Sequence, residues 1–360
     1  MVPAIALESS YLAKATLFYC PEESKASFKA SSKGLERNVH MRPTPAITRA
    51  PRPRSSFKRK GLWGASILIL LLIACVGVSV YVGWKLTHPV RDTLKDTPEA
   101  HGIHFEQVEF QSRTNDVTLK GWFLESESSP AKLNIIMAHG YRKNRLQADA
   151  EALKLSKTLV DQGYNVLMFD FRNSGESGGD VTSVGYLEKY DLLGAVDWMN
   201  ANHPGTIALH GFSMGATTAL IAAAEEPSIV GIVADSPFNH LTRYLKENLP
   251  VWSHLPNFPF TPLILGILPQ LTGIDPDQVD GLSAVDRVYP RPILFIHSTD
   301  DHSVPYSNSE TMWAKHPDRF ELWKPSGADH VKSHAVHPKE YEEKVLQFYS
   351  RLEQHQPQQQ

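Results

Sequence analysis

A serine lies between two glycines at the point where an apolar strand turns into a helix. Residues 208–217, ALHGFSMGAT, start as a strand, pass through GFSMG around Ser213 and end in small residues that favour a closely packed helix. A turn of this type holds its serine in a strained conformation with the hydroxyl exposed above a sheet. Side chains two residues before or after the serine would collide with neighbouring chain, and glycine removes that collision. The stretch predicts an α/β fold with an exposed serine; the alternative is a glycine-rich helix entry that Ser213 only caps.

Strand and helix signals alternate along residues 105–353. Several strands are continuous apolar runs, the pattern of a parallel sheet with both faces covered. We expect strands at 105–111, 117–124, 133–138, 164–169, 206–210, 229–234, 292–297 and 319–323. We expect helices at 147–161, 184–201, 214–225, 307–316 and 336–353. The alternation predicts an α/β domain with a mostly parallel central sheet of about eight strands and helices on both faces.

Residues 240–290 interrupt this alternation. Five prolines lie within residues 250–269, among tryptophan, phenylalanine and leucine. We expect a helical lid insertion that folds over Ser213, with apolar side chains that line a hydrophobic pocket. Helices that pack on the sheet would have the same composition, and the two arrangements are not exclusive.

The charge is divided between a basic N-terminal segment and an acidic body. Residues 1–60 carry 12 Lys and Arg against 4 Asp and Glu, a net charge of +8, and the remaining 300 residues carry −11. Because residues 1–60 also lack hydrophobic periodicity, we expect a disordered segment, in which Met41 is an alternative start. The acidic body argues against a nucleic-acid partner. Both cysteines, Cys20 and Cys75, precede the body, which excludes a disulfide or a cysteine-bound metal within it.

An uncharged stretch of 23 residues, Leu62 to Trp84, separates the basic segment from the body. As a helix it would be about 34 Å long, enough to cross a hydrocarbon core of about 30 Å. We therefore expect a transmembrane helix at 61–85 and a tether at 86–104. A buried core helix is the alternative, but core helices are rarely apolar on every side over this length.

Flanking charge predicts the orientation of this helix. Six Lys and Arg precede it within about 15 residues, and Lys85, Arg91 and Lys95 follow it. The positive-inside rule then puts the N-terminus in the cytoplasm and the body outside, as a single-pass protein of the cell membrane. A cleaved signal is the competing interpretation, because LIAC (72–75) resembles a lipobox whose Cys75 would carry lipid. The apolar run continues past Cys75, which favours an uncleaved anchor.

A serine hydroxyl needs a base to become a nucleophile, and the base needs an acid to orient it. In a sheet of this type the acid and then the histidine follow the serine, each on a loop after a later strand. Residues 292–305, PILFIHSTDDHSVP, are a strand followed by acids, and residues 323–334, WKPSGADHVKSH, are a strand end followed by histidines.

With these segments the chain resembles the α/β-hydrolase superfamily over about residues 105–350. The likeness is greatest to membrane-anchored hydrolases of Gram-positive bacteria and to the esterase and prolyl-oligopeptidase-like branches. The segments that carry it are HGY (139–141), FDFRNSGESGG (169–179), GFSMGA (211–216), DSPF (235–238), HSTDDHSVP (297–305) and GADH (327–330). Many relatives have His-Gly where this chain has His297-Ser298, a position that is not catalytic.

The resemblance implies an acid and a base for Ser213. The family's Asp-x-x-Val-Pro matches Asp301, with the adjacent Asp300 as a rival. The family's Gly-Ala-x-His matches His330 as the base.

Other polar residues near this motif compete with His330. His334 and His337 are rival bases, while Asp329 is badly placed to orient its sequence neighbour. The i, i+4 spacing of His330 and His334 would also suit a metal pair, but no third ligand is evident.

Acyl transfer also needs two backbone N–H donors for the developing oxyanion. The resemblance implies that Met214, after the nucleophile, and Tyr141, on the loop after the strand at 133–138, supply them. The alternative is that Tyr141 is a loop residue whose aromatic side chain only lines the pocket. The glycine-rich loop at 169–179, with Asp170 and Arg172, is expected to brace the loops around the site, because it lacks a phosphate-binding signature.

These patterns predict a serine hydrolase that forms an acyl-enzyme on Ser213 and needs no cofactor or metal. Its substrate would be a small-molecule ester, with a serine peptidase of the prolyl-oligopeptidase-like branch as the alternative. A non-catalytic membrane-tethered binding protein on the same fold is a second alternative. It is disfavoured because Ser213, Asp301 and His330 are all present.

Overall fold

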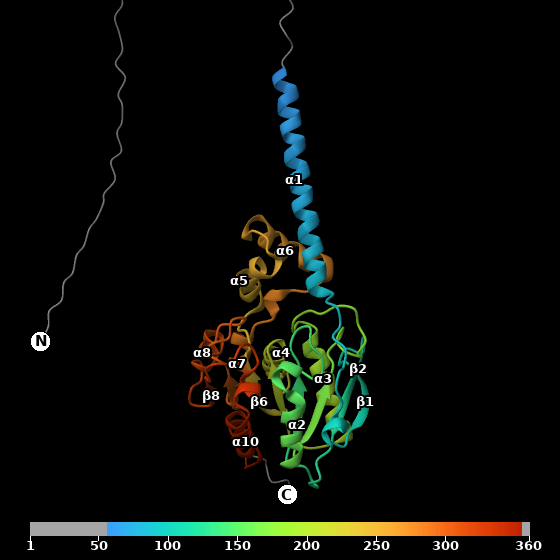
Figure 1. The fold of residues 1–360 in the computed structure, drawn as a ribbon, viewed down its shortest axis with the longest axis vertical. Coiled ribbons are helices and arrows are strands. Elements are labelled where there is room, and N and C mark those ends of the chain that lie inside the picture. Colours follow the sequence, from blue (N-terminus) through green and yellow to red (C-terminus); the bar gives the residue numbers. More distant parts are fainter. Residues whose placement is uncertain (1–55, 355–360) are drawn as a thin grey trace, which may run out of the picture. The chain divides into compact units, whose positions relative to one another are not determined.

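The computed structural model describes residues 56–354, with side chains from residue 59 onward. The segment predicted to be disordered, 1–60, lies almost wholly outside the described residues. The described part holds one long N-terminal helix and a folded domain built on a sheet (Figure 1).

The eight strands of the sheet have the order β1-β2-β4-β3-β5-β6-β7-β8. Their bounds are β1 Glu106–Gln111, β2 Thr118–Leu124, β3 Asn134–Ala138, β4 Asn165–Phe169, β5 Ile207–Phe212, β6 Ile229–Asp235, β7 Ile293–Ile296 and β8 Phe320–Trp323. β2 is antiparallel to β1 and to β4, and the other neighbouring pairs are parallel. The mostly parallel sheet is confirmed, and each strand lies within two residues of its predicted bounds.

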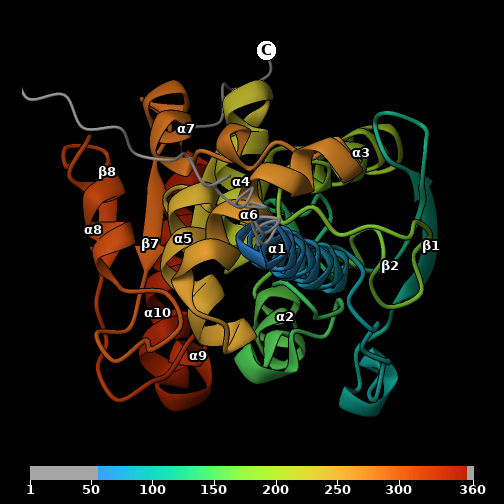
Figure 2. The same cartoon turned by 90° about the horizontal axis from the view of Figure 1, so that it is seen from above.

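Helices cover both faces of this sheet (Figure 2). One face packs against α3 (Glu188–Asn202), α4 (Met214–Glu225) and α7 (Gly281–Val288), and the other packs against α2 (Ala152–Asp161) and α10 (Pro338–Gln354). Successive residues of a strand point to opposite faces, so Ile136 of β3 joins the first core and Ile135 the second. The shorter elements are η1 Pro98–His101, η2 Ala148–Ala150, η3 Pro276–Gln278, α8 Ser307–Trp313 and α9 Ser333–Val336.

Two helices after β6 form the predicted lid. They are α5 (Leu241–Ser253) and α6 (Asn257–Thr272), and their side chains line the cavity beside Ser213. The rest of the 240–290 segment packs on the sheet instead: α7 buries Ala284, Val285 and Val288 in the core that it shares with α4. The segment therefore contains both arrangements that its composition allowed.

The apolar stretch forms α1 (Ser56–Thr87), which is longer than the predicted 61–85. The span from Arg59 to Thr87 is long and apolar enough to cross a membrane, and its most apolar stretch has a mean hydropathy of 2.7. Its most apolar window is only 6% buried, which does not fit a core helix. The following segment contacts the domain, since Arg91 donates to the carbonyls of Ser177 and Gly179 at 2.5 Å each.

Candidate active site

The turn between β5 and α4 holds Ser213 in a strained conformation. Its φ and ψ angles are 53° and −115°, which residues with a Cβ rarely adopt. A Cβ at Gly211 would lie 2.4 Å from the carbonyl oxygen of Gly215, and one at Gly215 would lie 2.1 Å from that of Ala138. Both glycines are therefore required, as predicted. The Ser213 side chain makes no capping bond to α4, which removes the capping interpretation.

Ser213, His330 and Asp301 form a hydrogen-bonded line at the carboxyl edge of the sheet. Ser213 follows β5, Asp301 follows β7 and His330 follows β8, so the parallel strands deliver all three to one edge. Nε2 of His330 lies 2.8 Å from the Ser213 hydroxyl oxygen. Nδ1 of His330 lies 2.7 Å from Oδ2 of Asp301. With the proton on Nδ1, the imidazole donates to the carboxylate and presents a free lone pair to the serine.

Asp301 is held as a carboxylate by its surroundings. Its side chain is fully buried, and its Oδ1 accepts from the backbone N–H groups of Ser303 and Val304 at 2.8 Å each. Burial alone would raise its pKa, but hydrogen bonds from His297 and His330 outweigh burial and hold the pKa well below its usual range. A carboxylate that stays ionised suits the role of orienting an imidazole.

The rival residues are engaged elsewhere. Oδ2 of Asp300 accepts from the Gly327 N–H at 2.6 Å. Nδ1 of His334 lies 2.8 Å from the Ala150 carbonyl, and Nε2 of His337 lies 2.7 Å from the Ser326 carbonyl. Across residues 56–354, no three histidine, cysteine or acidic side chains are grouped to hold a metal ion.

Two backbone N–H groups are available beside Ser213. Within the described chain, the N–H groups of Tyr141 and Met214 have no acceptor. The intervening loop is fixed, because the Gly140 N–H donates to Oε1 of Gln147 at 2.6 Å. Met214 is also the first residue of α4, where the helix dipole favours negative charge. Both N–H groups are therefore free to donate to an acceptor from outside the chain.

The match to a protein family supports the chemistry that this geometry allows. Residues 127–358 match the profile of a family described as X-Pro dipeptidyl-peptidase, S15 family. The chain belongs to the S15 family.

The relatives of this S15 chain include both an esterase and a lipase. It is 30% identical to the uncharacterized protein YqkD of Bacillus subtilis, over 79% of this chain and 97% of that protein. It is 26% identical to lysophosphatidylserine lipase ABHD12 of Xenopus tropicalis, over 53% of this chain and 48% of that protein. Among solved structures, the Pyrococcus furiosus esterase Pf2001 aligns with a TM-score of 0.62 at 28% identity, over 74% of this chain and 98% of that one. The S15 chain is a serine hydrolase of the α/β-hydrolase fold.

His297 is a buried neighbour of Asp301 that the sequence analysis did not assign. Its Nε2 lies 2.8 Å from the Val304 carbonyl and 3.2 Å from Oδ2 of Asp301. Both partners are acceptors, so Nε2 must carry a proton, and Nδ1 can accept from the Ser309 hydroxyl at 2.7 Å. The histidine at the end of β7 was visible in HSTDDHSVP, but its contact with the acid was not.

Asp235 is a second buried carboxyl beneath the nucleophile, and it was also missed. Its backbone carbonyl accepts from the Ser213 N–H at 2.8 Å. Its Oδ1 accepts from the Ser236 hydroxyl at 2.8 Å and its Oδ2 from the Tyr341 hydroxyl at 3.0 Å. Burial raises its pKa to about 6. Tyr341 in turn contacts Nε2 of His210 at 3.0 Å, so a buried polar network supports the turn from below.

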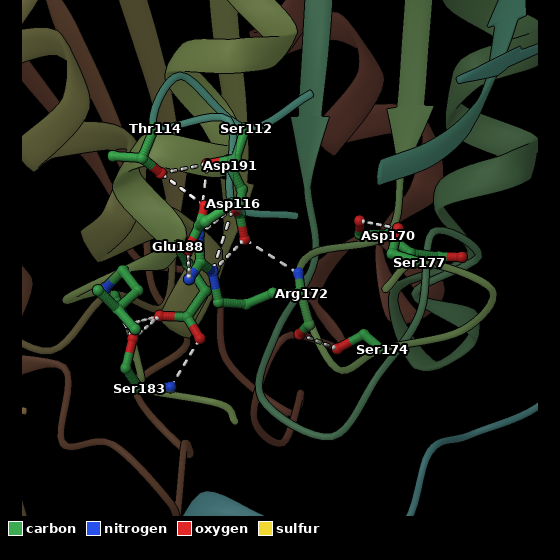
Figure 3. Close-up of polar contacts among 12 residues, drawn as sticks. Ser112, Thr114, Asp116, Asp170, Arg172, Ser174, Ser177, Ser183, Glu188 and Asp191 are labelled. Atoms are coloured by element: carbon green, nitrogen blue, oxygen red, sulfur yellow. Dashed lines mark hydrogen bonds and ion pairs between the residues drawn. The ribbon is translucent and has the colours of Figure 1, made fainter. Parts of the chain in front are cut away.

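The loop after β4 braces the site, as predicted for FDFRNSGESGG. The fully buried Asp170 accepts from the Arg145 guanidinium at 2.6 Å. Figure 3 shows Arg172 beside Asp191 and Asp116, which it contacts at 2.8 and 3.1 Å. These ion pairs, of which those with Asp170 and Asp191 are fully buried, fix the loop that lies next to the segment following α1.

A cavity of about 720 Å³ opens beside Ser213. Its walls include the turn with Ser213 and Met214, the loop from Gly140, the loop with His330, the lid helices α5 and α6, and the last two turns of α1. Much of the lid wall is aliphatic, from Leu241, Leu245, Leu249, Ile264 and Leu268. The space can therefore hold a hydrophobic chain next to the nucleophile.

Proposed function

We propose that this chain is a carboxylic-ester hydrolase that acts through an acyl-enzyme on Ser213. The observation that carries the proposal is the hydrogen-bonded line of Ser213, His330 and Asp301, with two available N–H donors beside it. That arrangement has every part that acyl transfer needs and requires no cofactor.

In the proposed mechanism, His330 takes the serine proton on Nε2 as the hydroxyl oxygen attacks the ester carbonyl carbon. The oxyanion of the tetrahedral intermediate accepts from the N–H groups of Tyr141 and Met214. His330 then gives its proton to the leaving alcohol, and the acyl group remains on Ser213. Water, deprotonated by the same imidazole, then attacks the acyl carbon; the bond from that carbon to the Ser213 oxygen breaks, the serine oxygen takes the proton back from His330, and the acid leaves. Asp301 keeps the other imidazole proton on Nδ1 throughout.

The lining of the cavity favours esters over peptides. In the described chain, the only carboxylate in the lining is Asp149. Its oxygens already accept from Nζ of Lys143 at 2.8 Å and from Nε2 of Gln147 at 2.7 Å. An enzyme that removes residues from a peptide N-terminus would need an unpaired anion for the terminal ammonium. The aliphatic wall of the lid suits an acyl chain instead.

The names of the relatives support the same choice. The Pyrococcus furiosus protein is an esterase and the Xenopus tropicalis protein is a lipase. The family description names a peptidase, so a serine peptidase remains the second candidate.

The test is active-site labelling together with a substrate panel. A fluorophosphonate probe should label the wild type and not Ser213→Ala, whereas the control Ser350→Ala, on α10, should label normally. p-Nitrophenyl esters from acetyl to palmitoyl should be hydrolysed faster than Ala-Pro p-nitroanilide. Faster turnover of the anilide would favour the peptidase, and a wild type that is not labelled would favour a non-catalytic binding protein.

We also propose that α1 anchors the protein in a membrane, with residues 61–85 crossing it, 86–104 as tether and 105–353 as the catalytic domain on the extracytoplasmic side. The length and hydropathy of α1 support the anchor. The basic residues before it support the orientation. Cleavage as a signal sequence is the alternative.

A further inference from the structure

The C-terminal end of α1 is part of the cavity wall. Tyr81, Val82, Lys85 and Leu86 line the same cavity as Ser213. α1 also packs closely on the lid, since a Cβ at Gly83 would lie 3.4 Å from Cδ1 of Leu268 in α6. The helix therefore does more than tether the domain, because it shapes the space in which a substrate would bind.

Hydrogen bonds fix this wall to the loops of the site. The Tyr141 hydroxyl donates to the Leu86 carbonyl at 2.6 Å, so the residue proposed as an oxyanion donor also holds the end of α1. The Thr182 N–H donates to the Thr87 carbonyl at 2.7 Å. These hydrogen bonds hold the end of α1 in place against the loops that line the cavity.

The lid presents apolar side chains to its surroundings beside α1. In both Figure 1 and Figure 2, α5 and α6 lie next to the half of α1 that leads into the domain. We call Val251, Trp252, Phe258 and Leu271 the lid face; all four are exposed, and Phe258 is 81% exposed. Exposed apolar patches of this kind mark interaction surfaces in soluble domains.

The depth of the lid face follows from α1. If Leu62 to Trp84 cross the bilayer, Tyr81 and Trp84 lie at its interface, where such aromatic residues are enriched. Tyr81 lines the cavity. Trp252 of the lid face lines the same cavity, so the lid face would lie at about the same level, against lipid rather than water.

We propose that the lid face lies in the membrane interface and that the cavity takes its substrate, a long-chain acyl ester, from the bilayer between α1 and the lid. The proposal rests on the ester hydrolase activity and the anchor proposed above. The aliphatic wall from Leu241 to Leu268 would receive the acyl chain while the ester carbonyl reaches Ser213. Contact of the lid face with lipid keeps the chain out of water on the way.

The first test locates the lid face without measuring activity. The full chain, with Cys20 and Cys75 replaced by serine, carries a nitroxide at Phe258→Cys and is placed in phosphatidylcholine vesicles. The control is Tyr289→Cys, which is 42% exposed and precedes β7, at the sheet edge away from Ser213. We expect oxygen to relax the label at 258 more than a water-soluble nickel chelate does, and the reverse at 289. Chelate access at 258, or dipolar broadening from a second copy, would overturn the proposal.

The second test separates entry of substrate from chemistry. Phe258→Glu and the control Tyr289→Glu are assayed in the same vesicles with p-nitrophenyl acetate and with p-nitrophenyl palmitate. We expect Phe258→Glu to lose at least tenfold on palmitate and to stay within twofold on acetate, while the control keeps both. Equal rates on palmitate for the two variants would overturn the proposed route. Absence of wild-type hydrolysis of either ester would instead overturn the ester hydrolase, and the label at 258 would still report on the lid face.

Discussion

At the scale of single residues, Asp301 and Asp300 form a natural pair for testing the acid. We expect Asp301→Asn to lower kcat on p-nitrophenyl butyrate by about 10³–10⁴-fold. An amide can donate to Nδ1 of His330, which would move the imidazole proton to Nε2 and remove the acceptor that Ser213 needs. Asp300→Asn should stay within a few-fold, because Asp300 contacts the Gly327 N–H instead. A similar loss in both variants would contradict the assignment.

Asp235 gives a prediction about the pH dependence of stability. Its folded pKa of about 6 is above the usual value of 3.8, so its contribution to stability is present below pH 4 and is lost as the pH rises through 6. The asparagine in Asp235→Asn does not ionise. We therefore expect the unfolding free energy of the wild type, relative to Asp235→Asn, to fall by up to about 3 kcal/mol between pH 4 and pH 7.

Guanidinium unfolding in detergent at several pH values measures this difference. Asp318→Asn, at an exposed position before β8, controls for the loss of a negative charge as such. If the difference in unfolding free energy between the wild type and Asp235→Asn is the same at every pH, Asp235 does not lose stabilisation as it ionises, and the prediction is wrong.

The residues that the sequence singled out and the residues it missed differ in how their contacts arise. Ser213, Asp301 and His330 each follow an apolar strand, so a parallel sheet brings them to one edge whatever its detailed packing. The contacts of His297 with Asp301 and of Asp235 with Tyr341 depend instead on the detailed packing of side chains in the folded domain. Asp235 accepts a hydrogen bond from Tyr341, which is 106 residues away in sequence, and no local sequence pattern predicts that contact.

At the scale of elements, Arg172 has two acidic partners that differ in burial (Figure 3). Asp191 of α3 is fully buried, whereas the side chain of Asp116, on the turn between β1 and β2, is 48% exposed. Asp191→Asn should cost about 3–5 kcal/mol of unfolding free energy, because it leaves a buried guanidinium without its main counter-charge. Asp116→Asn should cost about 1 kcal/mol or less. Equal losses of unfolding free energy in the two variants, measured by chemical denaturation, would show that burial does not determine how much each ion pair stabilises the fold.

Element positions were predictable where apolar residues follow a regular period. Continuous apolar runs predicted several of the eight strands, and the small residues after Ser213 predicted α4 at its observed bounds. The proline-rich segment was harder, because Pro250 lies inside α5 and Pro262 inside α6 where propensity argues against a helix. Packing of α5 and α6 on each other, and of α6 on α1, stabilises these helices, and such tertiary contacts are not visible in local sequence.

At the scale of the whole molecule, the charge distribution and α1 together predict an orientation. The basic residues before α1 should hold the N-terminus on the cytoplasmic side, and the acidic domain should lie on the other side. The lid face would then meet the outer leaflet, so the orientation also decides which pool of esters the site can reach.

Cysteine labelling in intact cells tests this orientation. In a Cys75→Ser background, a membrane-impermeant maleimide should label Asp318→Cys in the domain, and it should label the native Cys20 only after detergent is added. Replacing the basic residues at 52, 54 and 58–60 by glutamine should weaken or invert this result, because the charge difference across α1 sets it. Labelling of Cys20 but not of residue 318 in intact cells would place the domain in the cytoplasm. A mature chain that begins after Thr87, as read by mass spectrometry, would mean that the segment is cleaved, and the wall that α1 gives to the cavity would then be absent from the mature protein. A chain that begins at Met41 would lack Cys20 but keep α1.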